Sequence, residues 1–161
     1  MSNIDQIAFF WIGNDIAIPT LLVKSIKLVY SDDVKIFHLT NFQTAKIEGV
    51  TKTVRSSLPN DIMLARLHGY KNFPYNNSMT FFCDADSLVT GKLELQALKE
   101  DIYFIKREQD ALINHNFPEY YPEFVNKKFK EVMPYLFGGM VFRDGERFFS
   151  DLLEKCYSLP K

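Results

Sequence analysis

The stretch MTFFCDADSLVTG (residues 79–91) passes from an apolar run to two carboxylates within a few positions. The residues 81–83 are typical of a buried strand, and Asp84 and Asp86 follow at once. Residues i and i+2 of a strand point to the same side, so the pattern predicts that both carboxylates face one cleft at the carboxyl end of a central strand. Ligands of open α/β sheets bind at that edge. The stretch therefore predicts a binding site beside the core.

Two neighbouring carboxylates repel each other, and a hard divalent cation such as Mn²⁺ or Mg²⁺ relieves that repulsion. A plain turn after a strand is the alternative, because Asp and Ser favour turns.

Two functional classes compete for the pattern. In haloacid-dehalogenase-like phosphatases the first Asp is the nucleophile, but their motif lies near the N-terminus and a second acidic pair follows. In nucleotide-sugar glycosyltransferases, the pair holds the metal against a diphosphate.

The composition is that of an ordinary globular protein. The chain has 161 residues, of which 47% are hydrophobic and 24% charged, so one domain over residues 1–161 is expected. A net charge of −1 gives no overall field that would attract nucleic acid.

The two cysteines, Cys83 and Cys156, make no disulfide framework and are expected to be reduced. The apolar run 7–13 is shorter than the roughly 20 residues that span a bilayer. We expect no transmembrane segment and a cytoplasmic protein, with peripheral attachment to a membrane left open.

Alternating strands and helices predict an α/β sandwich. The helix at 59–73 is expected to begin at Asn60 or Asp61, with Met63, Leu67 and Tyr70 on one face. The segment 107–122 is the least regular and is expected to be a loop beside a site. Strands are expected at 7–13, 34–40, 51–56, within 79–91, at 101–107 and at 134–142, and the further helices at 18–31, 121–132 and 145–158.

Three segments together resemble glycogenin and its family-eight glycosyltransferase relatives. The most specific is LARLHGYKNFPYNNSMTFFCDADSLV (64–89), which is similar to the family's helix of the type Leu-x-Lys-Leu-His followed by an apolar strand that ends in Asp-Ala-Asp. FFWIGNDIAIPTLLVKSIK (9–27) is similar to the first strand, loop and helix of that family, and YLFGGMVFRDGERFFSDLL (135–153) to a later strand. The order and spacing of the segments match over roughly residues 7–155.

The resemblance implies a GT-A (nucleotide-diphospho-sugar transferase) fold, a Rossmann-like α/β/α sandwich with a mixed, mostly parallel central sheet. It implies a hexosyltransferase whose donor is a nucleotide-diphosphate sugar, most often a UDP-hexose, with a glycan, lipid or protein acceptor left open. Asp84 and Asp86 are implied to hold Mn²⁺ or Mg²⁺. The residues implied to contact the donor nucleotide are Trp11, Gly13, Asn14, Arg66, Asp84 and Ala85.

The sequence departs from the family at two of the implied positions. Gly138 and Gly139 stand where the family has an Asn-Ser pair near the donor sugar, so only backbone groups remain there. Arg66 occupies the position at which the family has a lysine that faces the donor phosphates. A guanidinium binds phosphate well, although it is not equivalent to an ammonium.

A later Asp-Gln segment and a histidine that completes the metal shell in the family have no counterpart up to Lys161. His38 is expected in a strand and His68 in a helix, which leaves His115 in the irregular segment as the remaining candidate ligand. Two alternatives therefore stand beside an active transferase: a catalytically incomplete nucleotide-sugar-binding module, and a chain whose site is completed by an oligomer or a partner.

Overall fold

Six strands of the described chain form one mixed sheet in the order β3-β2-β1-β4-β6-β5. The computed structural model describes residues 4–93, 100–108, 124 and 126–159. Neighbouring strands run parallel from β3 to β4, whereas β6 is antiparallel to both β4 and β5. The strands are β1 (Gln6–Phe10), β2 (Lys35–Thr40), β3 (Lys52–Arg55), β4 (Thr80–Cys83), β5 (Ile102–Lys106) and β6 (Tyr135–Phe142).

The central strand β1 is buried along its whole length. A strand covered on both faces is expected to be continuously apolar, and successive side chains of β1 enter opposite layers of the core. Ile7 and Phe9 pack in one hydrophobic cluster, while Ala8 and Phe10 pack in the other. The apolar run at the start of the chain therefore fixes β1 as the middle of the sandwich.

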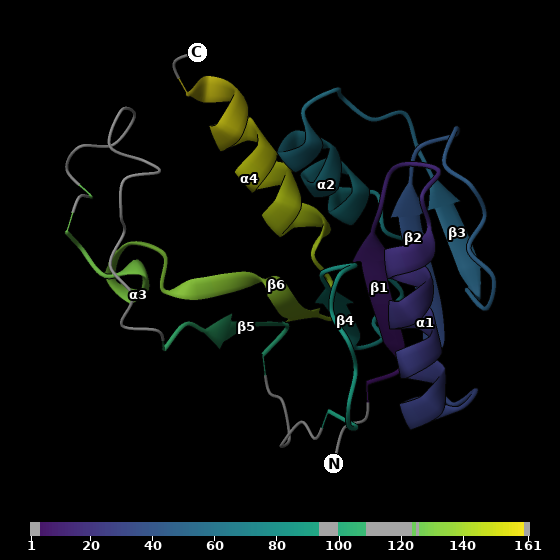
Figure 1. Cartoon of the computed structure of the whole chain (residues 1–161). Coiled ribbons are helices and arrows are strands. Elements are labelled where there is room, and N and C mark those ends of the chain that lie inside the picture. Colours follow the sequence, from purple (N-terminus) through teal and green to yellow (C-terminus); the bar gives the residue numbers. More distant parts are fainter. Residues whose placement is uncertain (1–3, 94–99, 109–123, 125, 160–161) are drawn as a thin grey trace.

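Helices cover both faces of the sheet (Figure 1). On one face, α1 (Ala17–Tyr30) buries Leu22 and Ile26 against the first cluster. On the other face lie α2 (Ile62–Lys71) and α4 (Glu146–Ser158), which pack with the second cluster. A Cβ at Gly69 would come within 3.0 Å of the Phe10 ring, so the glycine lets α2 approach β1 closely.

These elements confirm most of the expected segments, including the mixed, mostly parallel sheet. The first strand is shorter than expected and ends at Phe10 instead of residue 13. The helix expected at 121–132 is confirmed only at its end, where α3 (Phe129–Val132) is the α-helix of the described part. Asn126 has a φ of 67° and Lys128 is extended, which excludes both from a continuous helix. Residues 121–123 and 125 lie outside the described chain. No helix among the described residues is long and apolar enough to cross a bilayer.

Candidate functional site

The topology places a crevice at the carboxyl ends of β1 and β4. The chain passes from β1 to β2 on one side, and β4 pairs with the other side of β1. Such a reversal of strand order is where open α/β sheets bind ligands. A cavity of about 430 Å³ lies there. Its lining residues come from β1 and the loop after it, from the start of α1, from α2, and from the end of β4 and the turn after it: Phe10, Trp11, Ile12, Ile18, Ile62, Met63, Arg66, Tyr70, Cys83, Asp84, Ala85 and Asp86.

A second cavity, of about 600 Å³, adjoins the first one. Both are lined by Arg66, Cys83 and Asp84. The remaining walls of the second cavity come from the segment 87–91, from Gly138 and Gly139 with their neighbours on β6, and from Ile105 and Arg107 among others. The Arg66–Asp84 pair therefore stands at the junction of the two cavities.

The carboxylates expected on a strand lie in a turn. β4 ends at Cys83, and the backbone N–H of Ser87 donates to the carbonyl of Asp84 over 3.1 Å. The expected placement of both residues at one cleft beyond a central strand is confirmed, but they lie after the strand, so strand alternation is not what places them. The turn brings both residues to the first cavity. The side chain of Asp84 is 38% exposed and ion-paired, whereas Asp86 is exposed.

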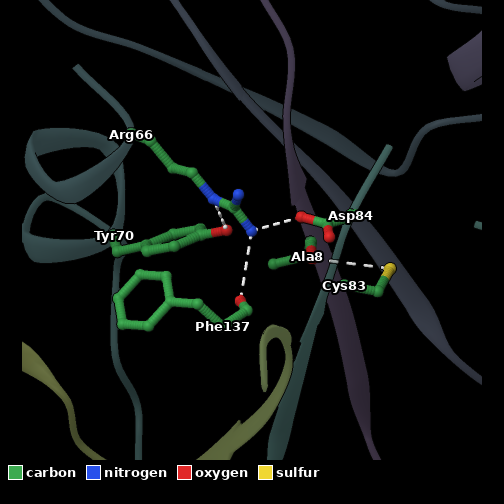
Figure 2. A network of polar contacts seen from close by, with 6 residues as sticks. All are labelled: Ala8, Arg66, Tyr70, Cys83, Asp84 and Phe137. Carbon is green, nitrogen blue, oxygen red and sulfur yellow. Dashed lines mark hydrogen bonds and ion pairs between the residues drawn. The ribbon is translucent and has the colours of Figure 1, made fainter. Parts of the chain in front are cut away.

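Arg66 is the centre of a polar network (Figure 2). Its Nε donates to the Tyr70 hydroxyl over 2.7 Å, and its Nη2 donates to the Phe137 carbonyl over 3.1 Å and to Asp84 Oδ1. Burial lowers the pKa of Arg66, but the Tyr70 hydroxyl and the Asp84 carboxylate outweigh that effect and raise it. Burial also raises the pKa of Tyr70 to about 12, against the opposing effect of Arg66. At neutral pH the site therefore holds a charged guanidinium and a protonated phenol.

Gly138 provides the space in which Asp84 lies. A Cβ on Gly138 would come within 2.1 Å of Asp84 Oδ2, a separation that no side chain tolerates. The backbone N–H of Asp84 also donates to the Gly138 carbonyl over 3.1 Å. A Cβ on Gly139 would lie 2.4 Å from Ile105 Cδ1, so a side chain there would displace the end of the half-exposed Ile105 side chain. Gly138 is thus the glycine that leaves space for the Asp84 carboxylate.

The loop after β1 is held by hydrogen bonds to β2 and the segment after it. The carbonyl of Trp11 accepts from Thr40 Oγ1 over 2.6 Å and lies 3.1 Å from His38 Nε2. Gly13 has a φ of 129°, a value that favours glycine, and its N–H donates to Thr44 Oγ1 over 3.1 Å. Trp11 lines the first cavity; Gly13 and the exposed Asn14 lie in the same loop but not in that lining.

The donor set of the first cavity fits a hard divalent cation that also contacts a phosphate. Within the described ranges, no three His, Cys, Asp or Glu side chains converge as a complete metal site. Asp84 and Asp86 nevertheless supply carboxylate oxygens to the same cavity. Mg²⁺ sites commonly use one or two carboxylates with substrate phosphates. Neither His38 nor His68 lines either cavity, and His115 lies outside the described residues.

Two partners of Arg66 were not expected from the sequence pattern. They are the hydroxyl of Tyr70, which was expected only as part of an apolar helix face, and the backbone carbonyl of Phe137. The i, i+4 spacing of Arg66 and Tyr70 on one helix was a signal for the first contact. Of the other two residues expected on that helix face, Leu67 is buried, whereas Met63 is 56% exposed and lines the first cavity.

Comparison with solved structures identifies the architecture. The galactosyltransferase LgtC, solved in complex with donor and acceptor sugar analogs, superposes with a TM-score of 0.59 over 97% of this chain, at 13% identity. The glycosyltransferase GlyE of Streptococcus pneumoniae TIGR4 superposes with a TM-score of 0.52 over 98% of this chain, also at 13% identity. The chain has a GT-A-like fold. It spans 66% of the LgtC chain and 38% of the GlyE chain.

Sequence comparison finds no matching family model and no matching curated protein. The expected membership of the glycogenin-like family therefore stays a prediction.

Proposed function

We propose that this chain binds a nucleotide-diphosphate sugar, with UDP-hexose as the expected donor, and transfers the hexose to an acceptor. The observation that carries the proposal is the placement of Arg66, Asp84 and Asp86 around one cavity at the switch point of a GT-A-like sheet. Both structural neighbours described above are named as glycosyltransferases. Whether the acceptor is a glycan, a lipid or a protein is left open.

The charge of the cavity supports a role for a divalent cation. Its charged lining side chains are Arg66, Asp84 and Asp86, which sum to −1 when all are ionised. A diphosphate would be repelled by that net charge. In the proposal Asp84 and Asp86 hold Mn²⁺ or Mg²⁺, which would neutralise charge on the diphosphate. Arg66 provides a further positive group for the same phosphates.

The remaining assignments follow the shape of the two cavities. Trp11 provides an aromatic wall for the nucleotide, with Gly13 and Asn14 as neighbouring loop contacts and the backbone of Ala85 facing the same cavity. The donor sugar is assigned to the second cavity, beside the backbone of Gly138 and Gly139. The junction at Arg66 and Asp84 would then lie near the bond that breaks. Groups placed at that point stabilise the departing diphosphate most effectively.

The proposal is tested by thermal unfolding with nucleotide diphosphates. UDP with Mn²⁺ is expected to raise the unfolding temperature of the wild-type chain, and Asp86→Ala is expected to abolish the increase. UDP, GDP and the other nucleoside diphosphates are compared, each with Mn²⁺ and with a chelator. No metal-dependent increase with any of them would contradict the proposal. The matched control is Asp33→Ala, which removes an exposed carboxylate that lines neither cavity.

A second candidate is a nucleotide-sugar-binding module that does not turn over. Gly138 and Gly139 place no side chain beside the donor-sugar cavity, which favours this candidate. Release of free sugar or transfer to an added acceptor, measured with UDP-hexoses and Mn²⁺, distinguishes the two. Detectable turnover that is lost in Asp86→Ala excludes the binding module.

A further inference from the structure

The hydroxyl of Tyr70 is a polar atom buried in a cluster of aromatic rings. Tyr70 is fully buried, and its ring packs at 5.0 Å from Phe82 and 5.2 Å from Phe149. A phenylalanine would fill the same space. The hydroxyl forms one hydrogen bond within the described chain, with Arg66 Nε. Buried Tyr hydroxyls normally have a partner, and here that partner is a residue of the candidate site.

The contacts of Arg66 leave one edge of its guanidinium unused. A guanidinium has five N–H donors in a fixed fork. Nε is bound to Tyr70, and Nη2 is bound to Phe137 and Asp84. Among the described residues, no hydrogen bond uses Nη1. Because the guanidinium is planar, fixing Nε and Nη2 also fixes the direction of the two Nη1 donors.

Resting on the function proposed above, we propose that Tyr70 is a positioning residue for diphosphate binding. Its hydroxyl holds the guanidinium of Arg66 so that Nη1 is presented to a phosphate oxygen of the nucleotide. The aromatic packing of Tyr70 makes the hydroxyl a rigid support. The Phe137 carbonyl supports the Nη2 side in the same way. Tyr70 itself does not contact the phosphate.

Asp84 alone is not sufficient to hold Arg66. The Asp84 side chain is 38% exposed and lies in a turn, whereas Tyr70 is rigidly packed on the same helix as Arg66. A ligand that engages Asp84 would weaken its bond to Arg66. The Tyr70 hydroxyl would then hold Nε, and the Phe137 carbonyl would hold Nη2, as the remaining partners of the guanidinium.

The test compares UDP with uridine on the variant Tyr70→Phe, with binding measured by calorimetry in Mn²⁺. Loss of one charge-assisted hydrogen bond is expected to weaken UDP binding about tenfold. Uridine binding is expected to be unchanged, since uridine lacks the phosphates that Arg66 contacts. A purely structural role for Tyr70 would weaken both ligands together. In an Arg66→Lys background, Tyr70→Phe is expected to cause no further loss, because the hydroxyl then has no guanidinium to orient.

The matched control is Tyr75→Phe. The hydroxyl of Tyr75 donates to the backbone carbonyl of Tyr70 over 2.9 Å and does not contact Arg66. Its removal is expected to lower stability without changing the ratio of UDP to uridine affinity.

Three outcomes decide the inference. Equal UDP binding by the wild type and Tyr70→Phe overturns the positioning role alone. Absence of nucleotide diphosphate binding by the wild type overturns both this role and the proposed function. If Tyr70→Phe does not fold, NMR of the wild-type chain decides instead: the Arg66 Nε–H is expected to be protected from solvent exchange, and rapid exchange overturns the role.

Discussion

Replacing Gly138 by alanine is expected to break the ion pair at the junction of the two cavities. The new Cβ would lie 2.1 Å from Asp84 Oδ2 and 2.9 Å from its Cγ, where ordinary contacts are 3.4–4 Å. The carboxylate would have to retreat by roughly 1 Å or more, which is enough to lose its hydrogen bond to Arg66. Strand β6 cannot relieve the overlap easily, because it pairs with β4 on one side and β5 on the other.

The cost follows from the exposure of the pair. A hydrogen bond to a charged group contributes about 1.5–3 kcal/mol. Because Asp84 is 38% exposed, solvent screening places the loss near the lower end of that range, and we expect Gly138→Ala to lower the free energy of unfolding by about 1–2 kcal/mol. UDP binding is expected to weaken as well, since Asp84 and Arg66 are both displaced.

Urea denaturation followed by circular dichroism measures the loss. Gly91→Ala is the control for stability alone, because a Cβ at Gly91 meets nothing within 4 Å but this residue lines the second cavity. Gly138→Ala with wild-type stability and wild-type UDP affinity would refute the assigned packing of Asp84.

Three further predictions concern the elements around the site. Burial lowers the pKa of His38 below 6.5, so the unfolded chain binds a proton at this residue more readily than the folded chain, and stability is lost as the pH falls. His38→Gln is expected to reduce this loss, measured as urea midpoints between about pH 8 and pH 5. The same pH dependence in the wild type and the variant would contradict the prediction. Burial raises the pKa of Cys83 to about 12, so its thiol should not react in the folded chain. In Cys156→Ser, where Cys83 is the remaining thiol, a thiol reagent should label the chain only after denaturant is added. Rapid labelling of the folded chain would count against this prediction. Asp61→Ala removes the cap of α2 and should cost about 1 kcal/mol in urea denaturation; a loss no larger than that of Asp33→Ala would show that the cap contributes little.

The sandwich was predictable because its elements carry local signals. The apolar run at β1 specifies a strand buried on both faces, and Asp61 marks the start of α2 through its side-chain oxygen. Pro19 is compatible with the first turn of α1, where no helical N–H is needed. These features depend on neighbours within a few residues, so the sequence alone expresses them.

The ends of strands and the partners of charged groups were not predictable in this way. The apolar pattern continues beyond Phe10, but β1 ends there in the structure. Asp84 faces Arg66, which is 18 residues earlier, and it lies in space left by Gly138 on β6. No spacing rule expresses a contact between a turn, a helix and an antiparallel strand. The position of β6 between β4 and β5 is a pairing choice of the same non-local kind.

The most direct test of the central claim is a calorimetric titration of UDP into the chain with Mn²⁺ and with a chelator. Wild type and Asp86→Asn are compared, since this substitution preserves size while it removes the exposed carboxylate. The account predicts saturable UDP binding that requires the metal and is about tenfold or more weaker in Asp86→Asn. UDP binding of equal affinity with and without metal, or no binding of UDP or any other nucleoside diphosphate, would contradict it.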